Sequence, residues 1–285
     1  MSIIRYRTGE VRFVWRILII LLLTVAIAVI LRFIPISIYT TVLVSDGIAE
    51  ANALASAKAT VFEDPFWSTV IGILNGLMSL LLVWFMIKVI ERNRFEWKTV
   101  GLDWRNNSLS LLGAGALLAL LLYASDRLVG HAFGSSIPSL NIMLAGLSFP
   151  IVFQKFVLYL AMGFGEEVVF RGYVQTRLVE HYGAIWGILI ASITFTLMHL
   201  GFTSLSLVSI ISGVLLWVTI GTLYHLSKSL YLVGMFHGVA NTLINTLHIE
   251  SNEIGGLLVN ALALLLVVIF AFRRARSSAV SPNPV

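Results

Sequence analysis

The feature that most constrains this chain is a series of apolar runs, each about as long as a membrane-spanning helix. The run 17–34, for example, is interrupted only by Thr24 and Arg32. About 20 predominantly apolar residues suffice for a helix to cross the hydrocarbon core of a bilayer. The runs therefore predict an all-α fold, a polytopic integral membrane bundle of about eight transmembrane helices. Windows of about 19 residues place these helices at 14–34, 68–90, 108–125, 149–170, 184–202, 205–226, 230–247 and 255–272.

Composition narrows the class of protein further. Hydrophobic residues make up 58% of the 285 positions and charged residues only 12%, which excludes a soluble enzyme. The chain has no cysteine, so thiolate catalysis and a thiolate metal site are excluded. The net charge is +5, but the basic residues lie beside the apolar runs, where they orient the chain in the lipid bilayer. Nucleic acid is therefore not an expected partner, and the distribution of Lys and Arg predicts that both termini are cytoplasmic.

Ionisable side chains inside the spans carry most of the functional information. Each costs roughly 2.5–3.5 kcal/mol on insertion scales and usually faces the interior of a bundle. Three polar clusters stand out, at 166–171, 195–199 and 237–241. In each of them, polar or aromatic residues recur at a spacing of four, which places them on one face of a helix.

The first cluster contains two adjacent carboxylates and one cation. Glu167 and Arg171 are four residues apart and are expected to pair, whereas Glu166 points about 100° away around the helix. Glu166 is then the free carboxylate. The alternative is that all three residues form a buried ion network that only fixes the packing.

Counting residues from the turns predicts that the clusters meet at one depth. Glu166 lies 17 residues before Gly183 and His199 lies 16 after it, so both are roughly 25 Å from a turn at 181–183. His237 lies nine residues after Lys228. It reaches the same level if the hairpin formed by the fourth and fifth predicted helices extends out of the membrane. This requires a long helix with a polar face that projects toward the cytoplasm, formed by Arg171, Gln175, Arg177 and Glu180.

The residue types of the predicted site indicate a hydrolytic reaction. A carboxylate and an imidazole that share a water, here Glu166 and His199, can remove its proton. His237 and the Asn241 amide lie on one face and suit a tetrahedral oxyanion. The same groups also suit a divalent metal such as zinc, held by Glu166, His199 and His237 with one position open for water. Residue types and spacing do not choose between the two mechanisms, and Ser192 is a less favoured nucleophile because no G-x-S-x-G motif surrounds it.

The three motifs together resemble the CAAX protease and bacteriocin-processing family of intramembrane proteases, also called the Abi family. They read Glu-Glu-x-x-x-Arg at 166–171, Phe-x-x-x-His at 195–199 and His-x-x-x-Asn at 237–241. The resemblance implies an intramembrane endopeptidase that acts on a membrane-associated peptide or protein. It also implies the role of each motif residue: Glu166 and His199 activate water, His237 and Asn241 stabilise the oxyanion, and Glu167, Arg171 and Phe195 support the site.

The resemblance also sets the expected organisation and the alternatives. Residues 149–250 would form the catalytic core of one integral domain, after a cytoplasmic segment 1–13 and N-terminal helices and loops 14–148, and before a last helix and tail 251–285. A prokaryotic plasma membrane is the expected location. Members of this family are commonly described as metalloproteases, although a glutamate-dependent mechanism has also been argued. The rival functions are an idle scaffold or bacteriocin self-immunity protein of the same fold, and a proton-coupled transporter.

Overall fold

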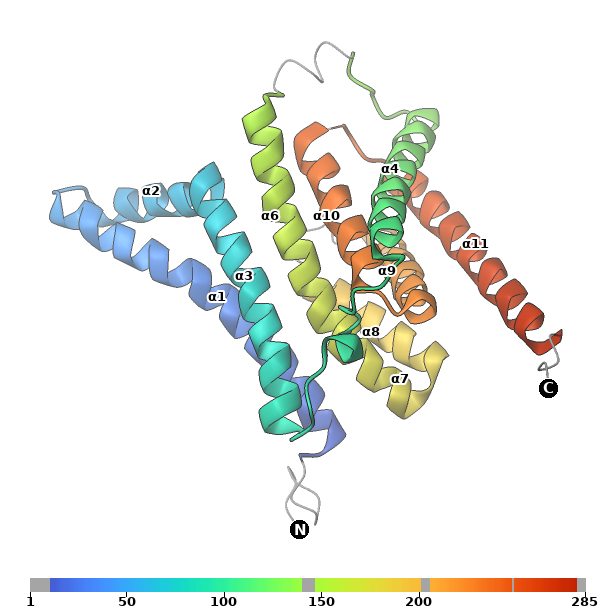
Figure 1. The fold of residues 1–285 in the computed structure, drawn as a ribbon. Helices are drawn as coiled ribbons and strands as arrows, with labels where there is room; N and C mark the ends of the chain where they lie inside the picture. Colours follow the sequence, from blue (N-terminus) through green and yellow to red (C-terminus); the bar gives the residue numbers. More distant parts are fainter. Residues whose placement is uncertain (1–10, 140–146, 201–205, 248, 281–285) are drawn as a thin grey trace.

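The computed structural model describes residues 11–139, 147–200, 206–247 and 249–280. Every regular element in these ranges is helical, so the predicted all-α membrane bundle is confirmed. In Figure 1, α6 and α10 run side by side in the centre, with α3 packed on α6 and α4 on α10. The last helix, α11, packs on α9 and α4 at one edge of the bundle. The elements of the second half are α4 (Ser108–Ala132), α6 (Phe149–Glu167), η3 (Val168–Gln175), α7 (Thr176–Tyr182), α8 (Ala184–Met198), α9 (Leu207–Ser227), α10 (Leu230–Leu247) and α11 (Glu253–Val280).

The first three helices form an N-terminal arm on one side of α6 in Figure 1. In this arm α2 (Glu50–Glu63) joins the far ends of α1 (Phe13–Ser45) and α3 (Pro65–Phe85). A turn of π-helix, η1 (Met86–Ile90), continues α3, and a short 3-10 helix, η2 (Trp97–Val100), precedes α4. The first helix was expected to end at residue 34, but it continues through Pro35. Residues 36–45 are still largely apolar, and the Thr40 hydroxyl donates to the carbonyl oxygen of Ile36 at 2.7 Å.

Five of the described helices are long and apolar enough to cross a membrane, fewer than the eight spans expected. They lie at Phe13–Ser45, Pro65–Ile90, Ser108–Ala132, Leu207–Ser227 and Glu253–Arg276. The other three expected spans correspond to α6, α8 and α10. Helix α8 is apolar but has only 15 residues, and α6 and α10 contain the polar residues of the first and third motifs.

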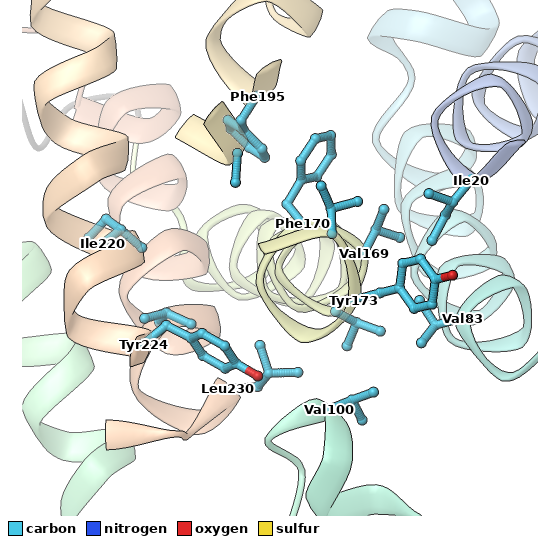
Figure 2. Packing of buried hydrophobic residues seen from close by; sticks show 14 of the residues in the cluster. Ile20, Val83, Val100, Val169, Phe170, Tyr173, Phe195, Ile220, Tyr224 and Leu230 are labelled. Atoms are coloured by element: carbon cyan, nitrogen blue, oxygen red, sulfur yellow. The ribbon is translucent and has the colours of Figure 1, made fainter. Parts of the chain in front are cut away.

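The element η3 lies at the centre of the hydrophobic core. All eight of its side chains are buried, and Figure 2 shows it end-on with Phe170, Val169 and Tyr173 radiating from it toward different helices. Tyr173 points to Ile20 and Val83 of the N-terminal arm. A π-helical segment is rare and occurs frequently at functional sites, and this one begins directly after Glu167.

Burial of η3 overturns one expectation from the sequence. Arg171 and Gln175 were expected on a polar face projecting toward the cytoplasm, but each is only 1% exposed. Gln175 donates from Nε2 to the main-chain oxygen of Gly221 at 2.8 Å. The prediction was wrong for these two residues because η3 is packed among other helices on all sides and leaves no polar face toward solvent.

A buried carboxylate, Glu91, joins the N-terminal arm to the core. Its side chain is fully buried and accepts hydrogen bonds from Tyr173 Oη at 2.9 Å and from Arg177 Nε and Nη2 at 2.9 and 2.7 Å. Arg16 of α1 lies 3.8 Å from the same carboxylate. Glu91 was not predicted as a structural residue, although it is an acidic residue within a stretch of basic residues from Lys88 to Lys98.

Candidate active site

Three helices bring Glu166, His199 and His237 together. Glu166 lies at the end of α6, and its Oε2 atom is 3.5 Å from His199 Nε2 and 3.7 Å from His237 Nε2. His199 immediately follows α8, and His237 lies in α10. Residues far apart in the sequence therefore meet, as the depth count predicted. The turn used in that count is present, since α7 ends at Tyr182 and Gly183 adopts a positive φ of 80° before α8 begins.

Local contacts fix the orientation of the His199 ring. Its Nδ1 atom is 2.9 Å from the carbonyl oxygen of Phe195, one turn earlier. The two rings also stack, with centroids 4.3 Å apart and an angle of 24° between their planes. These contacts hold the ε nitrogen of His199 toward Glu166.

Glu167 orients the second imidazole. Its Oε1 atom is 3.0 Å from His237 Nδ1, and its Oε2 atom is 3.2 Å from Arg171 Nε. The pairing of Glu167 with Arg171, expected from their spacing, is thus confirmed, and the contact with His237 is an addition. Since the δ nitrogens of both histidines face oxygen atoms, the ε nitrogens of both rings are directed toward the Glu166 carboxylate.

An aromatic pair encloses the Arg171 guanidinium. The Cζ atom of Arg171 lies 4.6 Å from the ring centroid of Phe195 and 5.0 Å from that of Trp217 in α9. The Trp217 ring is also 5.1 Å from the ring of His237. Phe195 was predicted as part of the site from its motif, but Trp217 was not, because the residues on either side of it in the sequence are apolar.

Asn241 lies one turn after His237 on α10. Within the described ranges its side chain makes no hydrogen bond, and its main-chain oxygen accepts one from Asn245 Nδ2 at 2.8 Å. The structure therefore places Asn241 on the expected helix and does not join its amide to the other site residues. The alternative nucleophile, Ser192, is 1% exposed and buried away from solvent.

The donor set can be compared with what a metal requires. Carboxylate oxygen and imidazole nitrogen are both ligand types that bind zinc. In the part of the chain that the structure describes, however, no group of three His, Cys, Asp or Glu side chains is arranged to hold a metal ion. Glu166, His199 and His237 are thus ligand types that suit zinc, and a metal held by these three side chains stays a prediction from the sequence.

An apolar cavity of about 200 Å³ lies between α3 and α6. Gly165, directly before Glu166, forms part of its wall. The cavity gives apolar groups a place beside the helix that carries the free carboxylate. Its other lining residues are Ile73, Gly76, Leu77, Leu80, Leu102, Ala161, Phe164 and Val168.

Comparison with known proteins gives one match. Residues 148–243 match the family described as "Type II CAAX prenyl endopeptidase Rce1-like". No curated protein and no solved structure matches the chain. The matched segment runs from the start of α6 into α10 and includes all three motifs. Residues 148–243 are therefore similar to the Rce1-like family, in line with the resemblance to CAAX proteases drawn from the motifs.

Proposed function

We propose that this protein is an intramembrane endopeptidase that hydrolyses a peptide bond in a membrane-associated protein or peptide. The observation that carries the proposal is the position of the Glu166 carboxylate, 3.5 Å and 3.7 Å from the ε nitrogens of two oriented imidazoles. The match of residues 148–243 to an endopeptidase family supports the same reaction. The cavity between α3 and α6 supports an apolar substrate group.

The proposed reaction begins with a water held between Glu166 and His199. Glu166 takes a proton from the water while the water oxygen forms a bond to the scissile carbonyl carbon. His237 donates from Nε2 to the resulting oxyanion, and Glu167 holds the orientation of its ring through Nδ1. Asn241, one turn further along α10, is the proposed second donor. The carbon–nitrogen bond then breaks, and the proton held by Glu166 passes to the leaving amine.

A metal-assisted reaction is the alternative mechanism, with Glu166, His199 and His237 as the ligands. A metal such as zinc would polarise the carbonyl and acidify water. The reaction proposed above uses the side chains of the protein alone, and we assign no step of it to a metal ion. The two mechanisms differ in a measurable way: the glutamate mechanism predicts unchanged activity after treatment with a chelator. A loss of activity that zinc restores would support the metal mechanism.

The test uses the full chain purified into lipid nanodiscs and an internally quenched peptide that ends in a farnesylated CAAX sequence. Wild-type protein is expected to cleave this peptide, and Glu166→Gln is expected to be slower by about 10²–10⁴-fold. The unfarnesylated peptide measures whether the lipid group is needed. Ser192→Ala is the matched control and is expected to retain activity. Equal rates for wild type and Glu166→Gln would contradict the proposal and favour the idle scaffold.

Substrates in the cell require a second measurement. Membrane fractions from cells carrying wild type or Glu166→Ala are compared by proteomics. We expect at least one membrane-associated protein to accumulate uncleaved with the variant. If both fractions contain the same products at equal abundance of the protease, the proposed activity is contradicted in that cell.

A further inference from the structure

Trp217 is the one aromatic residue of α9 that contacts both charged and imidazole groups of the described site. Its ring centroid is 5.0 Å from the Arg171 Cζ atom, 5.1 Å from the ring of His237 and 6.4 Å from that of His199. Its ring is also 4.2 Å from that of Phe195. The indole therefore touches members of all three motifs, although it belongs to none of them.

The surroundings of Arg171 explain why an aromatic ring is needed there. The guanidinium is buried, and among the described residues its nitrogen atoms make no hydrogen bond of good geometry. One carboxylate, that of Glu167, lies within ion-pairing distance at 3.2 Å. A buried cation with so few partners is costly. The faces of Phe195 and Trp217 reduce this cost because a cation–π contact is strongest where water is excluded.

The sequence of α9 brings Trp217 close to the site. Gly213 and Gly221 lie one turn before and one turn after it on the same face. A Cβ atom on Gly213 would lie 3.4 Å from Thr196 of α8, and one on Gly221 would lie 2.6 Å from Gln175 of η3. Gly221 therefore allows α9 to lie close to η3, whereas a Cβ atom on Gly213 would make an ordinary contact with α8. The indole of Trp217 lies between the two, against Phe195 of α8 and Arg171 of η3.

We propose that Trp217 is a positioning residue of this site. Its indole holds the Arg171 guanidinium against Glu167, so that Glu167 keeps the His237 ring turned toward Glu166. The catalytic consequence of this role rests on the proposed function. The contact itself does not, and it is tested separately.

The first measurement tests the contact of Trp217 with Arg171 and His237, and it does not require an active enzyme. The seven tryptophans are labelled with 5-fluorotryptophan, and the ¹⁹F resonance of Trp217 is assigned from Trp217→Phe. We expect His237→Gln and Arg171→Lys each to shift this resonance. The resonance of Trp186, which is 61% exposed on α8, is the internal control and is expected to stay in place. A Trp217 resonance that does not move in either variant would overturn the proposal.

The second measurement tests the consequence for catalysis on the farnesylated peptide. Trp217→Leu removes the aromatic face and is expected to lower kcat by about tenfold, with a smaller effect on KM. Trp217→Phe keeps an aromatic face and is expected to restore most of the rate. Trp186→Leu is the matched control. A Trp217→Leu protein with wild-type kcat, or a Trp217→Phe protein as slow as Trp217→Leu, would overturn the positioning role.

The two measurements separate the two ways of failing. If wild-type protein cleaves no peptide while the fluorine shifts occur, the proposed function is contradicted and the contact of Trp217 with Arg171 and His237 is supported. If the peptide is cleaved and the fluorine resonance does not respond, the proposed function stands and the role of Trp217 is overturned. Monodisperse elution of each variant is checked first, so that an unfolded protein is not compared.

Discussion

The two adjacent glutamates of the first motif have different surroundings. Glu167 is fully buried between Arg171 and His237. Glu166 has a side chain that is 20% exposed, and its Oε2 atom is buried without a hydrogen bond in the described part of the chain. One carboxylate is therefore compensated by a neighbouring cation, and the other is held in a position that serves the reaction at a cost in stability.

This difference predicts opposite effects on stability. Glu166→Gln is expected to leave the thermal unfolding temperature equal to that of wild type or higher, because it removes a largely buried charge that makes no ion pair with a Lys or Arg side chain among the described residues. Glu167→Gln is expected to lower stability by about 3–5 kcal/mol, because it leaves the buried Arg171 without a counterion. Thermal unfolding of both variants in nanodiscs measures this. A Glu166→Gln protein that is the less stable of the two would contradict this assignment.

At this scale the sequence predicted contacts within one helix better than contacts between helices. The spacing of four gave the pair of Glu167 with Arg171 because both residues lie on one helix. The contact of Glu167 with His237 and the position of Trp217 depend on how α6, α9 and α10 turn toward one another. No local spacing encodes that rotation.

At the scale of helices, glycines set the close approach of α6 to its neighbours. A Cβ atom on Gly163 would lie 2.8 Å from the main-chain nitrogen of Gly238 in α10. One on Gly165 would lie 2.7 Å from the Cα atom of Gly76 in α3. Both obstacles are main-chain atoms, so the helices have to separate if a methyl group is added.

Alanine at either position is therefore expected to destabilise the fold by about 1–3 kcal/mol and to lower activity by moving Glu166. The matched control is Gly113→Ala in α4, where an added Cβ atom has nothing within 4 Å. This control is expected to be neutral or slightly stabilising, since alanine favours a helix. Unfolding measurements on the three variants provide the test. Equal stability of Gly163→Ala and Gly113→Ala would show that the close contact is not required.

Helices and turns were only partly predictable from apolar patterns. The turn at Gly183 was predicted because it separates two periodic runs. The continuation of α1 through Pro35 was not, because the residues around a proline in lipid can still satisfy the backbone. The π-helical turn of η3 was also not predicted, since it depends on packing from several sides and not on a local signal.

At the scale of the whole molecule, Glu91 links the N-terminal arm to the core that matches the protease family. It accepts hydrogen bonds from Tyr173 and Arg177, and Arg16 lies nearby. Glu91→Ala would leave the largely buried side chains of Arg16 and Arg177 without this carboxylate. We expect a loss of about 3–5 kcal/mol, together with greater protease accessibility of the arm.

The control for Glu91 is a carboxylate in the same loop that pairs at the surface. Glu96 lies 2.8 Å from Lys98 and is partly exposed. Glu96→Ala is expected to leave the unfolding temperature unchanged, because water replaces a surface partner. If both substitutions have the same effect, Glu91 does not join the two parts.

The predicted orientation is also a property of the whole chain. The basic residues next to the apolar runs predict that both termini are cytoplasmic. A reporter that is active only in the cytoplasm, fused to either terminus, is expected to be active in both fusions. Activity at one terminus alone would contradict the predicted arrangement of spans.

The central claim is that Glu166 and His199 act together on one water, and a double-mutant cycle tests it most directly. The value of kcat/KM for the farnesylated peptide is measured for wild type, Glu166→Gln, His199→Gln and the double variant. We predict a loss of about 10²–10⁴-fold in each single variant. Residues that act as a unit have strongly non-additive effects, so the double variant should be within about threefold of the slower single variant. Losses that multiply, or a wild-type value for Glu166→Gln, would contradict the account.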